Sequence, residues 1–420
     1  MRLHVTSEIG RLRRVLLHEP GREIDEMTPA MMERLLFEDI LFGDDARFEH
    51  ETFRRVLERA GAEVLDAEDL LAEALATEAG RGYLLRELGG TYGVARGVVE
   101  RLEGLAPAEL AAALLAGLRA PGGVAFDLDP VPNYFFQRDP QTVLGDRVVI
   151  AAMATDARER EALLARALFE HAPSLAGAAA DLFEIDAPPP SAGNPPRVHP
   201  NPTLEGGDVI VASPEVILIG ISVRTNRGGV EQLAEYLRRE QTPFRHLLLV
   251  ELPPRRSYMH LDTVFTLIDH GTCLAYRPVI EPSSAQAPSV YVYHVDLEAP
   301  SVSFAVRPSV RKALDAVGID LDLVPCGGSD LLDQDREQWT DGANAFAVAP
   351  GVIFLYARNH RTLDELARRG WRVVGEQEAA AGSEPLLDAG PTVVALTGNE
   401  LSRARGGPRC MTMPLVRDEP

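Results

Sequence analysis

Cysteine is scarce in this sequence. Only Cys273, Cys326 and Cys410 occur among its 420 residues. Such an odd and sparse set excludes a disulfide scaffold and is typical of a reducing compartment. No two of the three stand at the close spacing of a zinc site, and the sequence has no His-x-x-His or His-Glu-x-x-His segment. We therefore expect no metal site.

Long apolar runs and an excess of basic residues are also lacking. No run approaches the length needed to span a bilayer, and residues 1–7 contain no apolar signal core. The 63 acidic residues outnumber the 42 Lys and Arg, so the formal net charge is −21, which argues against nucleic acid or an anionic membrane as a partner. The hydrophobic share of 45% is enough for a sizeable core. We expect a globular cytoplasmic protein.

The first third of the chain predicts one strand and then mostly helix. Residues 11–18 have the pattern of a strand. Residues 28–62 look helical, with Thr28 as an N-cap, but the segment 35–43 interrupts the pattern and is expected to be a loop with exposed apolar residues. Residues 66–122 are rich in Ala, Leu and Glu at helical spacing, which predicts a helical insertion.

After residue 123 one pattern recurs four times: a polar residue, an apolar strand, a tight turn and a second strand. The four copies begin at Asp139, Asp208, Asp262 and Asn344. We expect the N-terminal strand and the strand after Cys410 to form a fifth unit. Units of this kind must stack into a solenoid or close into a ring, and in a ring the polar residues would converge at one end of the axis. The alternative is that they only terminate strands.

Cys410 stands among three arginines, Arg403, Arg405 and Arg409, behind a Gly-Gly-Pro turn. Cationic neighbours favour the thiolate, which is the nucleophilic form of cysteine. The alternative is a small buried apolar residue, the usual fate of a free cysteine. The segment alone does not decide between them.

Two further segments carry acids and a histidine. His260 and Asp262 would point to the same face of a strand, although a histidine bonded to a neighbour for structural reasons is more common. Glu205 and Asp208 flank two glycines, which permit a close backbone approach. Each signal is weak by itself.

Together these segments resemble the arginine deiminase family of the guanidine-modifying superfamily, the penteins. The resemblance covers nearly all of the chain. It implies an α/β fold, a five-bladed pseudosymmetric propeller, in a single catalytic domain over residues 1–420 with the helical insertion at 66–122. It is carried by residues 7–15, 36–39, 136–139, 204–208, 259–265, 339–344 and 405–411.

The resemblance also implies catalytic roles. Cys410 would be the nucleophile that attacks the guanidinium carbon to form a covalent amidino intermediate, and His260 the acid and base, paired with Glu205. Asp139 and Asp262 would hold the guanidinium nitrogens. The chemistry agrees, since carboxylates accept the parallel N–H donors of a planar cation in pairs.

Five more residues are implied to bind the substrate: Asn133, Phe136, Arg158, Arg224 and Arg405. Arg158 and Arg224 would bind an α-carboxylate, which favours L-arginine over agmatine. Without the resemblance, each arginine would be taken for a solvated surface charge.

The implied activity is hydrolysis of L-arginine to L-citrulline and ammonia, without metal or other cofactor, by a cytoplasmic homo-oligomer. The family usually has threonine at the position of Gln137. This difference leaves open a related enzyme that acts on agmatine or methylated arginine, or one that transfers the amidino group to an amine. A catalytically silent arginine-binding protein is the other alternative, and the intact set of Cys, His and acids argues against it. In so acidic a pocket, the substrate's guanidinium should be a major cation stabilising the thiolate, so Cys410 is expected to titrate higher in the free enzyme.

Overall fold

The computed structural model describes residues 2–123, 125–176, 182–187, 201–281, 291–299 and 304–420. The proline-rich segment 187–202, which the sequence predicts to be a loop, lies almost entirely outside these ranges. None of the described helices is both long and apolar enough to cross a membrane.

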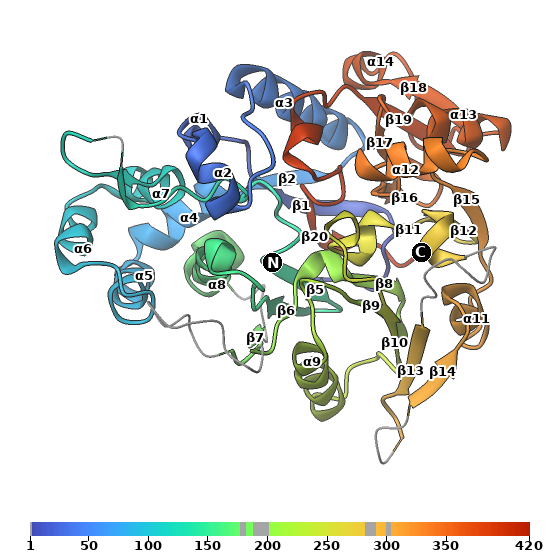
Figure 1. Cartoon of the computed structure of the whole chain (residues 1–420), viewed down its shortest axis with the longest axis horizontal. Helices are drawn as coiled ribbons and strands as arrows, with labels where there is room; N and C mark the ends of the chain where they lie inside the picture. The colour runs from blue at the N-terminus through green and yellow to red at the C-terminus, as the bar shows by residue number, and fades with distance from the viewer. Residues whose placement is uncertain (1, 124, 177–181, 188–200, 282–290, 300–303) are drawn as a thin grey trace.

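Five sheets share one plan: an antiparallel pair of strands, then a strand that runs parallel to the second member of the pair. Figure 1 shows them around a common centre. Within the described residues each is a separate, open sheet. They comprise β5 (Gln141–Leu144), β6 (Arg147–Ile150) and β7 (Leu182–Glu184); β8 (Val209–Ser213), β9 (Val216–Ile221) and β10 (His246–Glu251); β11 (Phe265–Asp269), β12 (Thr272–Ala275) and β15 (Asp322–Pro325); β16 (Phe346–Ala349), β17 (Val352–Tyr356) and β19 (Thr392–Leu396); and β20 (Met413–Arg417), β1 (Leu12–Leu17) and β2 (Glu63–Asp66).

The four predicted hairpins are present, and the fifth unit combines strands from opposite ends of the sequence. β20 pairs antiparallel with β1, which in turn pairs parallel with β2. Two sheets carry additional strands, and a two-stranded ribbon lies apart from the five. These are β13 (Tyr291–Asp296) and β14 (Phe304–Arg307) beside β10, β18 (Arg372–Gly375) beside β19, and the ribbon of β3 (Leu118–Arg119) and β4 (Phe126–Leu128).

Helices connect and cover the sheets because each has one apolar stripe. In α9, Val230, Leu233 and Leu237 are buried, and the Asn226 side chain accepts a hydrogen bond from the first turn. The remaining described helices are α1 (Arg22–Asp25), α2 (Pro29–Leu35), α3 (Gly43–Arg59), α4 (Ala67–Ala76), α5 (Glu78–Gly90), α6 (Arg96–Glu103), α7 (Pro107–Ala116), α8 (Glu159–His171), α10 (Arg277–Ile280), α11 (Val310–Asp315), α12 (Leu331–Trp339), α13 (His360–Arg368) and α14 (Glu376–Ala381), and α9 itself spans Arg227–Arg239.

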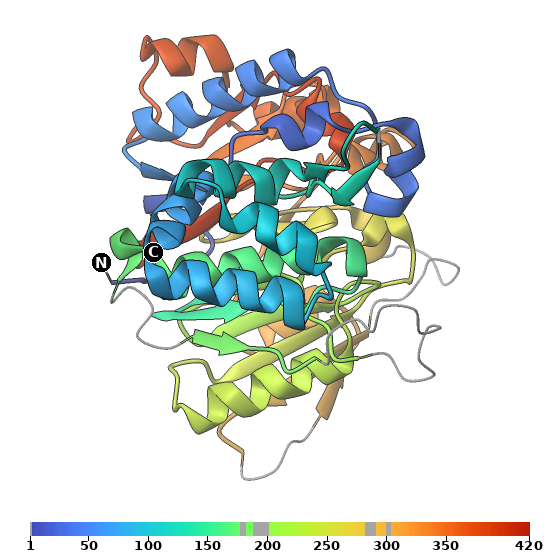
Figure 2. The same cartoon turned by 90° about the vertical axis from the view of Figure 1, so that its left-hand side faces the viewer.

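The segment predicted to be helical after residue 66 forms α4 to α7, which lie together on one side of the molecule (Figure 2). Their leucines share one apolar cluster with α8 and with Leu3, Val5 and Tyr134. The group therefore rests on the sheet of β5, β6 and β7 and on the sheet of β20, β1 and β2, whose Ile150 and Leu415 belong to the same cluster.

The loop between α2 and α3 differs from the expectation. Leu36 takes a left-handed conformation, with φ of 54°, which ends α2. The expectation of exposed apolar residues is wrong for most of the loop, because Phe37 and Leu41 are buried and only Phe42 is largely exposed, at 58%. Thr28 precedes α2 but its side chain makes no capping hydrogen bond.

Candidate active site

Two of the polar residues that head the repeat units, Asp208 and Asn344, bond to the backbone of other units. Asp208 accepts a hydrogen bond from the backbone N–H of Leu261, at 2.8 Å. Asn344 donates to the carbonyl of Asp262 at 3.1 Å and accepts from the backbone N–H of Cys410 at 3.2 Å. The sequence predicted that these polar residues would converge if the units formed a ring. Their hydrogen bonds hold in place the backbone segments that carry the candidate catalytic residues.

A small cavity of about 30 Å³ opens at this meeting point. It has room for about two water molecules. Glu205 and Asp262 do not line it and are fully buried beside it. The other eight predicted site residues all line it: Asn133, Phe136, Asp139, Arg158, Arg224, His260, Arg405 and Cys410.

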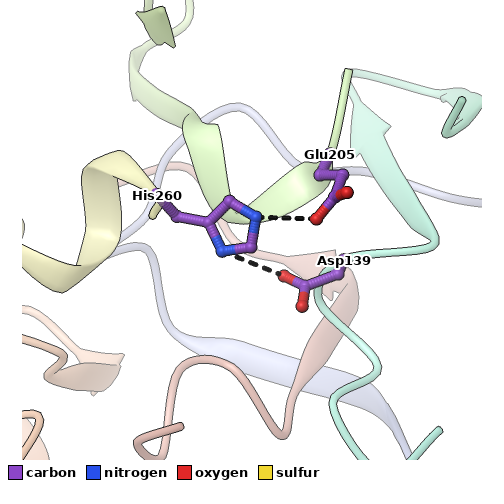
Figure 3. Close-up of side chains that lie close together, drawn as sticks. All are labelled: Asp139, Glu205 and His260. Carbon is purple, nitrogen blue, oxygen red and sulfur yellow. Dashed lines mark hydrogen bonds and ion pairs between the residues drawn. The ribbon is translucent and has the colours of Figure 1, made fainter. Parts of the chain in front are cut away.

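His260 lies between two carboxylates (Figure 3). Its Nε2 is 2.8 Å from Glu205 Oε2, and its Nδ1 is 3.7 Å from Asp139 Oδ1. Burial alone would lower the pKa of His260, but Asp139, Glu205 and Asp208 outweigh it and raise the pKa to about 9. The imidazole is therefore protonated at neutral pH and able to donate a proton.

The sequence predicted that His260 and Asp262 share a face because they alternate along a strand. This prediction is wrong, because His260 is not on a strand. It precedes a single 3₁₀ turn, Leu261–Thr263, which comes before β11. The geometry is set instead by the turn Gly206–Asp208: a Cβ on Gly207 would lie 2.6 Å from His260 Nδ1 and 2.9 Å from Asp139 Oδ1. Position 207 therefore has to be glycine for the His260 ring to approach the carboxylates of Glu205 and Asp139.

Glu205 stays ionised although it is fully buried. Burial raises its pKa, but Arg224, His260 and Arg158 outweigh this effect and lower the pKa to about 2. Its Oε1 also accepts the backbone N–H of Ala154 at 2.9 Å. A fixed negative charge on this side of the imidazole favours the protonated ring.

Asp139 and Asp262 each have one oxygen bonded to an arginine and one oxygen without a hydrogen-bond partner, although Oδ1 of Asp139 lies 3.7 Å from His260 Nδ1. Oδ2 of Asp139 accepts from Arg158 at 2.7 Å, and Oδ2 of Asp262 accepts from Arg409 at 2.7 Å. Oδ1 of both is buried, and neither has a hydrogen-bond partner within the described parts of the chain. The site therefore offers two carboxylate oxygens that can accept hydrogen bonds from a bound ligand.

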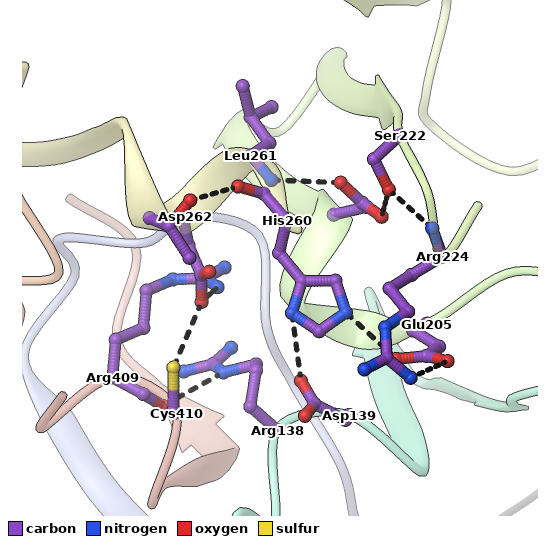
Figure 4. A network of polar contacts seen from close by, with 12 residues as sticks. Arg138, Asp139, Glu205, Ser222, Arg224, His260, Leu261, Asp262, Arg409 and Cys410 are labelled. Carbon is purple, nitrogen blue, oxygen red and sulfur yellow. Dashed lines mark hydrogen bonds and ion pairs between the residues drawn. The ribbon is translucent and has the colours of Figure 1, made fainter. Parts of the chain in front are cut away.

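Cys410 is held next to one of these acids, with its Sγ 3.8 Å from Asp262 Oδ2 (Figure 4). Burial raises the pKa of the thiol well above its ordinary value, and Asp262, Asp139 and Asp341 raise it further. Cys410 is thus a thiol rather than a thiolate in the absence of a cationic ligand. The neighbouring arginines do not activate the thiol in this state, and the raised pKa has the direction expected from the sequence for the free protein.

The neighbouring arginines have other partners. Arg405 donates to the carbonyls of Trp339 and Ser257 at 2.6 and 3.1 Å and lies over the Trp339 ring at 3.8 Å. The guanidinium of Arg409 binds Glu8 and Asp262. Nearness to Cys410 in the sequence did not predict where Arg405 and Arg409 point. In this turn the two side chains leave the backbone on different sides.

The loop between α2 and α3 covers the cavity. Its residues Leu36 and Glu38 line the wall. Glu38 pairs with Arg256 at 2.6 Å, and Asp39 with Arg403 at 2.9 Å. Two ion pairs therefore hold the loop down over Cys410 in this structure.

Gln137, the departure noted in the sequence, does not line the cavity. It is fully buried, and its amide donates to the Tyr134 carbonyl at 2.6 Å. Sequence reasoning also missed Glu161, which binds Arg158 from one helical turn away. That spacing of three residues on a helix was a usable signal.

Asp139, Glu205 and His260 could together offer ligands to a metal ion, since their ligand atoms lie within 4.8 Å of one another. Arg158 Nη1 lies 2.7 Å from Asp139 and 3.8 Å from Glu205. Its positive charge opposes a divalent ion between the same carboxylates. The arrangement therefore suits an organic cation with N–H donors better than a bare ion.

A family model described as arginine deiminase matches residues 33–88 and 116–417 of this chain. The arginine deiminase of Latilactobacillus sakei subsp. sakei (strain 23K) is 33% identical over 439 residues, covering 99% of this chain and 98% of that protein. The arginine deiminase of Clostridium perfringens (strain SM101 / Type A) is 34% identical over 447 residues, covering 99% and 98%.

Two solved structures share the fold at low identity. The amidinotransferase SxtG from Microseira wollei matches with a TM-score of 0.56 and 15% identity, covering 100% of this chain and 98% of that one. The N-terminal domain of ArgZ, an arginine dihydrolase from Cyanobacteria, matches with a TM-score of 0.51 and 14% identity, covering 96% and 97%. These likenesses concern the mixed α/β fold alone.

Proposed function

The chain belongs to the arginine deiminase family, and on that premise we propose that it hydrolyses L-arginine to L-citrulline and ammonia at the cavity beside Cys410. The observation that carries the proposal is the pair of buried oxygens that lack a hydrogen bond among the described residues, Oδ1 of Asp139 and Oδ1 of Asp262. A buried acceptor without a donor costs about 1–3 kcal/mol. A guanidinium group presents parallel N–H donors that can satisfy both.

Substrate binding would activate the nucleophile. A guanidinium cation held by Asp139 and Asp262 neutralises the charges that raise the pKa of Cys410, so the thiol can release its proton to water. The thiolate attacks the guanidinium carbon and forms a C–S bond. His260 gives its proton to the departing nitrogen, the C–N bond breaks and ammonia leaves. The product of this step is an amidino group on Cys410.

Hydrolysis completes the cycle. His260, now neutral, takes a proton from a water molecule, and the resulting hydroxide adds to the amidino carbon. The C–S bond breaks as the proton of the added hydroxyl passes to the sulfur, citrulline leaves, and Cys410 is restored as the thiol beside a protonated His260. Glu205 holds the imidazole in place and stabilises its charge through both steps, at 2.8 Å from Nε2.

The other end of the substrate is assigned to Arg224 and Arg158. Arg224 lines the cavity and lies 3.4 Å from Thr155 Oγ1 and 3.8 Å from Glu205. An α-carboxylate would give these arginines an anionic partner that agmatine lacks. The cavity must enlarge to admit arginine, so we assign the loop between α2 and α3 to opening and closing over it.

Incubation of the purified protein with L-arginine tests the function. We expect release of citrulline and ammonia in equal amounts, with agmatine and dimethylated arginine at the same concentration turned over far more slowly. Absence of citrulline at every pH from acid to alkaline would refute the proposal. A preference for agmatine would move the activity to another branch of the superfamily.

Activity is expected to fall as the pH rises through about 9. His260 has a pKa of about 9 because Asp139 and Glu205 outweigh its burial, so above that pH the fraction able to protonate ammonia falls about tenfold per pH unit. The protonated ring also stabilises the folded state below pH 6.5, and this stability is lost as the pH rises through about 9. The pH profile of kcat measures the first effect, and an alkaline limb near 6.5, the ordinary value, would contradict it.

Fold and assembly follow the same premise. We propose that the five sheets form the blades of a five-bladed pseudosymmetric propeller in one domain over residues 1–420, with 66–122 as a helical insertion. The common strand plan of the five sheets supports this. We further propose a cytoplasmic homo-oligomer that needs only water as co-reactant.

A further inference from the structure

Two buried groups of three residues share one geometry. In the first, Nη1 of Arg158 donates to Asp139 Oδ2 at 2.7 Å. The opposite edge of the same guanidinium binds Glu161: Nε donates to Oε1 at 3.0 Å and Nη2 to Oε2 at 2.7 Å. All three side chains are buried.

The second group repeats this arrangement atom for atom. Nη1 of Arg409 donates to Asp262 Oδ2 at 2.7 Å, and its Nε and Nη2 donate to the two oxygens of Glu8, each at 3.0 Å. Figure 4 shows the guanidinium of Arg409 beside the carboxylate of Asp262. Although the glutamates come from distant parts of the chain, one in α8 and one before β1, each holds its arginine in the same way.

The arrangement leaves the same atom available in both groups. Asp139 and Asp262 each use Oδ2 on the arginine and keep Oδ1 without a hydrogen-bond partner among the described residues. A carboxylate with one oxygen bonded to a rigid, planar guanidinium is restrained in its rotation, so its other oxygen has a preferred direction. The arginine also compensates a carboxylate charge that would be costly to bury alone.

We propose that Glu161 and Glu8 are positioning residues for the guanidinium end of the substrate, each fixing an arginine that aims one binding carboxylate. This inference rests on the proposed function. It gives Arg158 a task that its assignment to the α-carboxylate does not include, namely the orientation of Asp139. The loss of Glu161 should therefore harm every guanidinium ligand, whether or not the ligand has a carboxylate.

The substitution Glu161→Gln separates the two tasks because it keeps the size of the side chain and removes the charge. We expect kcat/KM for L-arginine to fall by about 10- to 100-fold, the effect of weakening a charge-assisted hydrogen bond. In a Cys410→Ala background, which cannot react, calorimetry should show the affinities for L-arginine and for agmatine falling by the same factor. Glu8→Gln should act on both ligands in the same way.

Arg224→Leu is the comparator and should weaken L-arginine binding alone, because Arg224 contacts neither Asp139 nor Asp262. Glu170→Gln, an exposed glutamate at the far end of α8, is the matched control and should leave both affinities unchanged. If Glu161→Gln does not fold, Glu161→Asp, which draws the carboxylate back by one methylene, carries the same comparison.

An affinity loss confined to L-arginine, or no loss, would overturn the proposal, as would a background protein that binds L-arginine but not agmatine. Failure of the proposed function looks different: the unsubstituted protein would then release no citrulline at all. Equal losses for both ligands, with turnover intact in the unsubstituted protein, support the inference.

Discussion

Cys410→Ala is expected to abolish citrulline release, with kcat lower by a factor on the order of 10⁶, the scale seen when a covalent nucleophile is removed. The sulfur lies 3.8 Å from Asp262 Oδ2, next to the carboxylates that would hold the guanidinium carbon in reach. Quenching the unsubstituted protein with acid during turnover and measuring the mass of the Cys410 peptide should show an added amidino-containing group. The variant should show none.

Cys273→Ala provides the control, because Cys273 is buried in β12 within a separate apolar cluster. This variant should keep the activity of the unsubstituted protein and form the same adduct. Full activity in Cys410→Ala, or an adduct on another residue, would contradict the covalent mechanism while leaving the family assignment intact.

Arg409→Met is expected to lower the free energy of unfolding by about 3–5 kcal/mol, the cost of breaking a buried ion pair from one side. The substitution leaves the carboxylates of Glu8 and Asp262 buried without the guanidinium that now binds both. Urea denaturation at neutral pH measures the change. The double variant Glu8→Gln/Arg409→Met should recover part of the loss, because one of the two uncompensated charges is then gone.

An exposed pair shows what burial contributes. Arg96 pairs with Glu100 in α6, but its side chain is 92% exposed, so Arg96→Met should cost less than about 1 kcal/mol. If Arg409→Met proved as stable as the unsubstituted protein, the buried pairs would not hold this part of the structure together.

Glu8 adds an acid dependence to the same region. Its pKa is lowered from 4.5 to about 2, since Arg409 and Arg138 outweigh the effect of burial. The stability it contributes is therefore present above pH 4.5 and lost as the pH falls through about 2.

The repeat units were predictable because alternating apolar residues and tight turns are local signals. The hairpins that begin after Asp139, Asp208, Asp262 and Asn344 are all present. The fifth unit was also predictable, since β1 and β20 were the remaining strands without a partner from their own neighbourhood. That Asp139, His260 and Cys410 line one cavity follows from the repeat, because each stands a few residues before the first strand of its unit.

Side-chain directions in the turns were not predictable. Arg405 and Arg409 flank the cysteine in sequence, yet one lies on Trp339 and the other on Glu8, which is 401 residues away. The burial of Phe37 was missed for a related reason: the loop after α2 packs against Phe135, a contact between distant segments that no local pattern contains. Charged residues near a cysteine in the sequence therefore do not predict the pKa of its thiol.

The pairing of β20 with β1 also has a consequence for how the chain is made. β1 is among the first strands to be synthesised, and its antiparallel partner β20 comes after the other four units. Until β20 arrives, one edge of β1 lacks its partner, and an unpaired edge is a site for association with other chains. The segment that covers this edge is the one that begins three residues after Cys410. A ribosome-bound chain that has not reached β20 is therefore prone to aggregate, and synthesis of this strand covers the edge of β1.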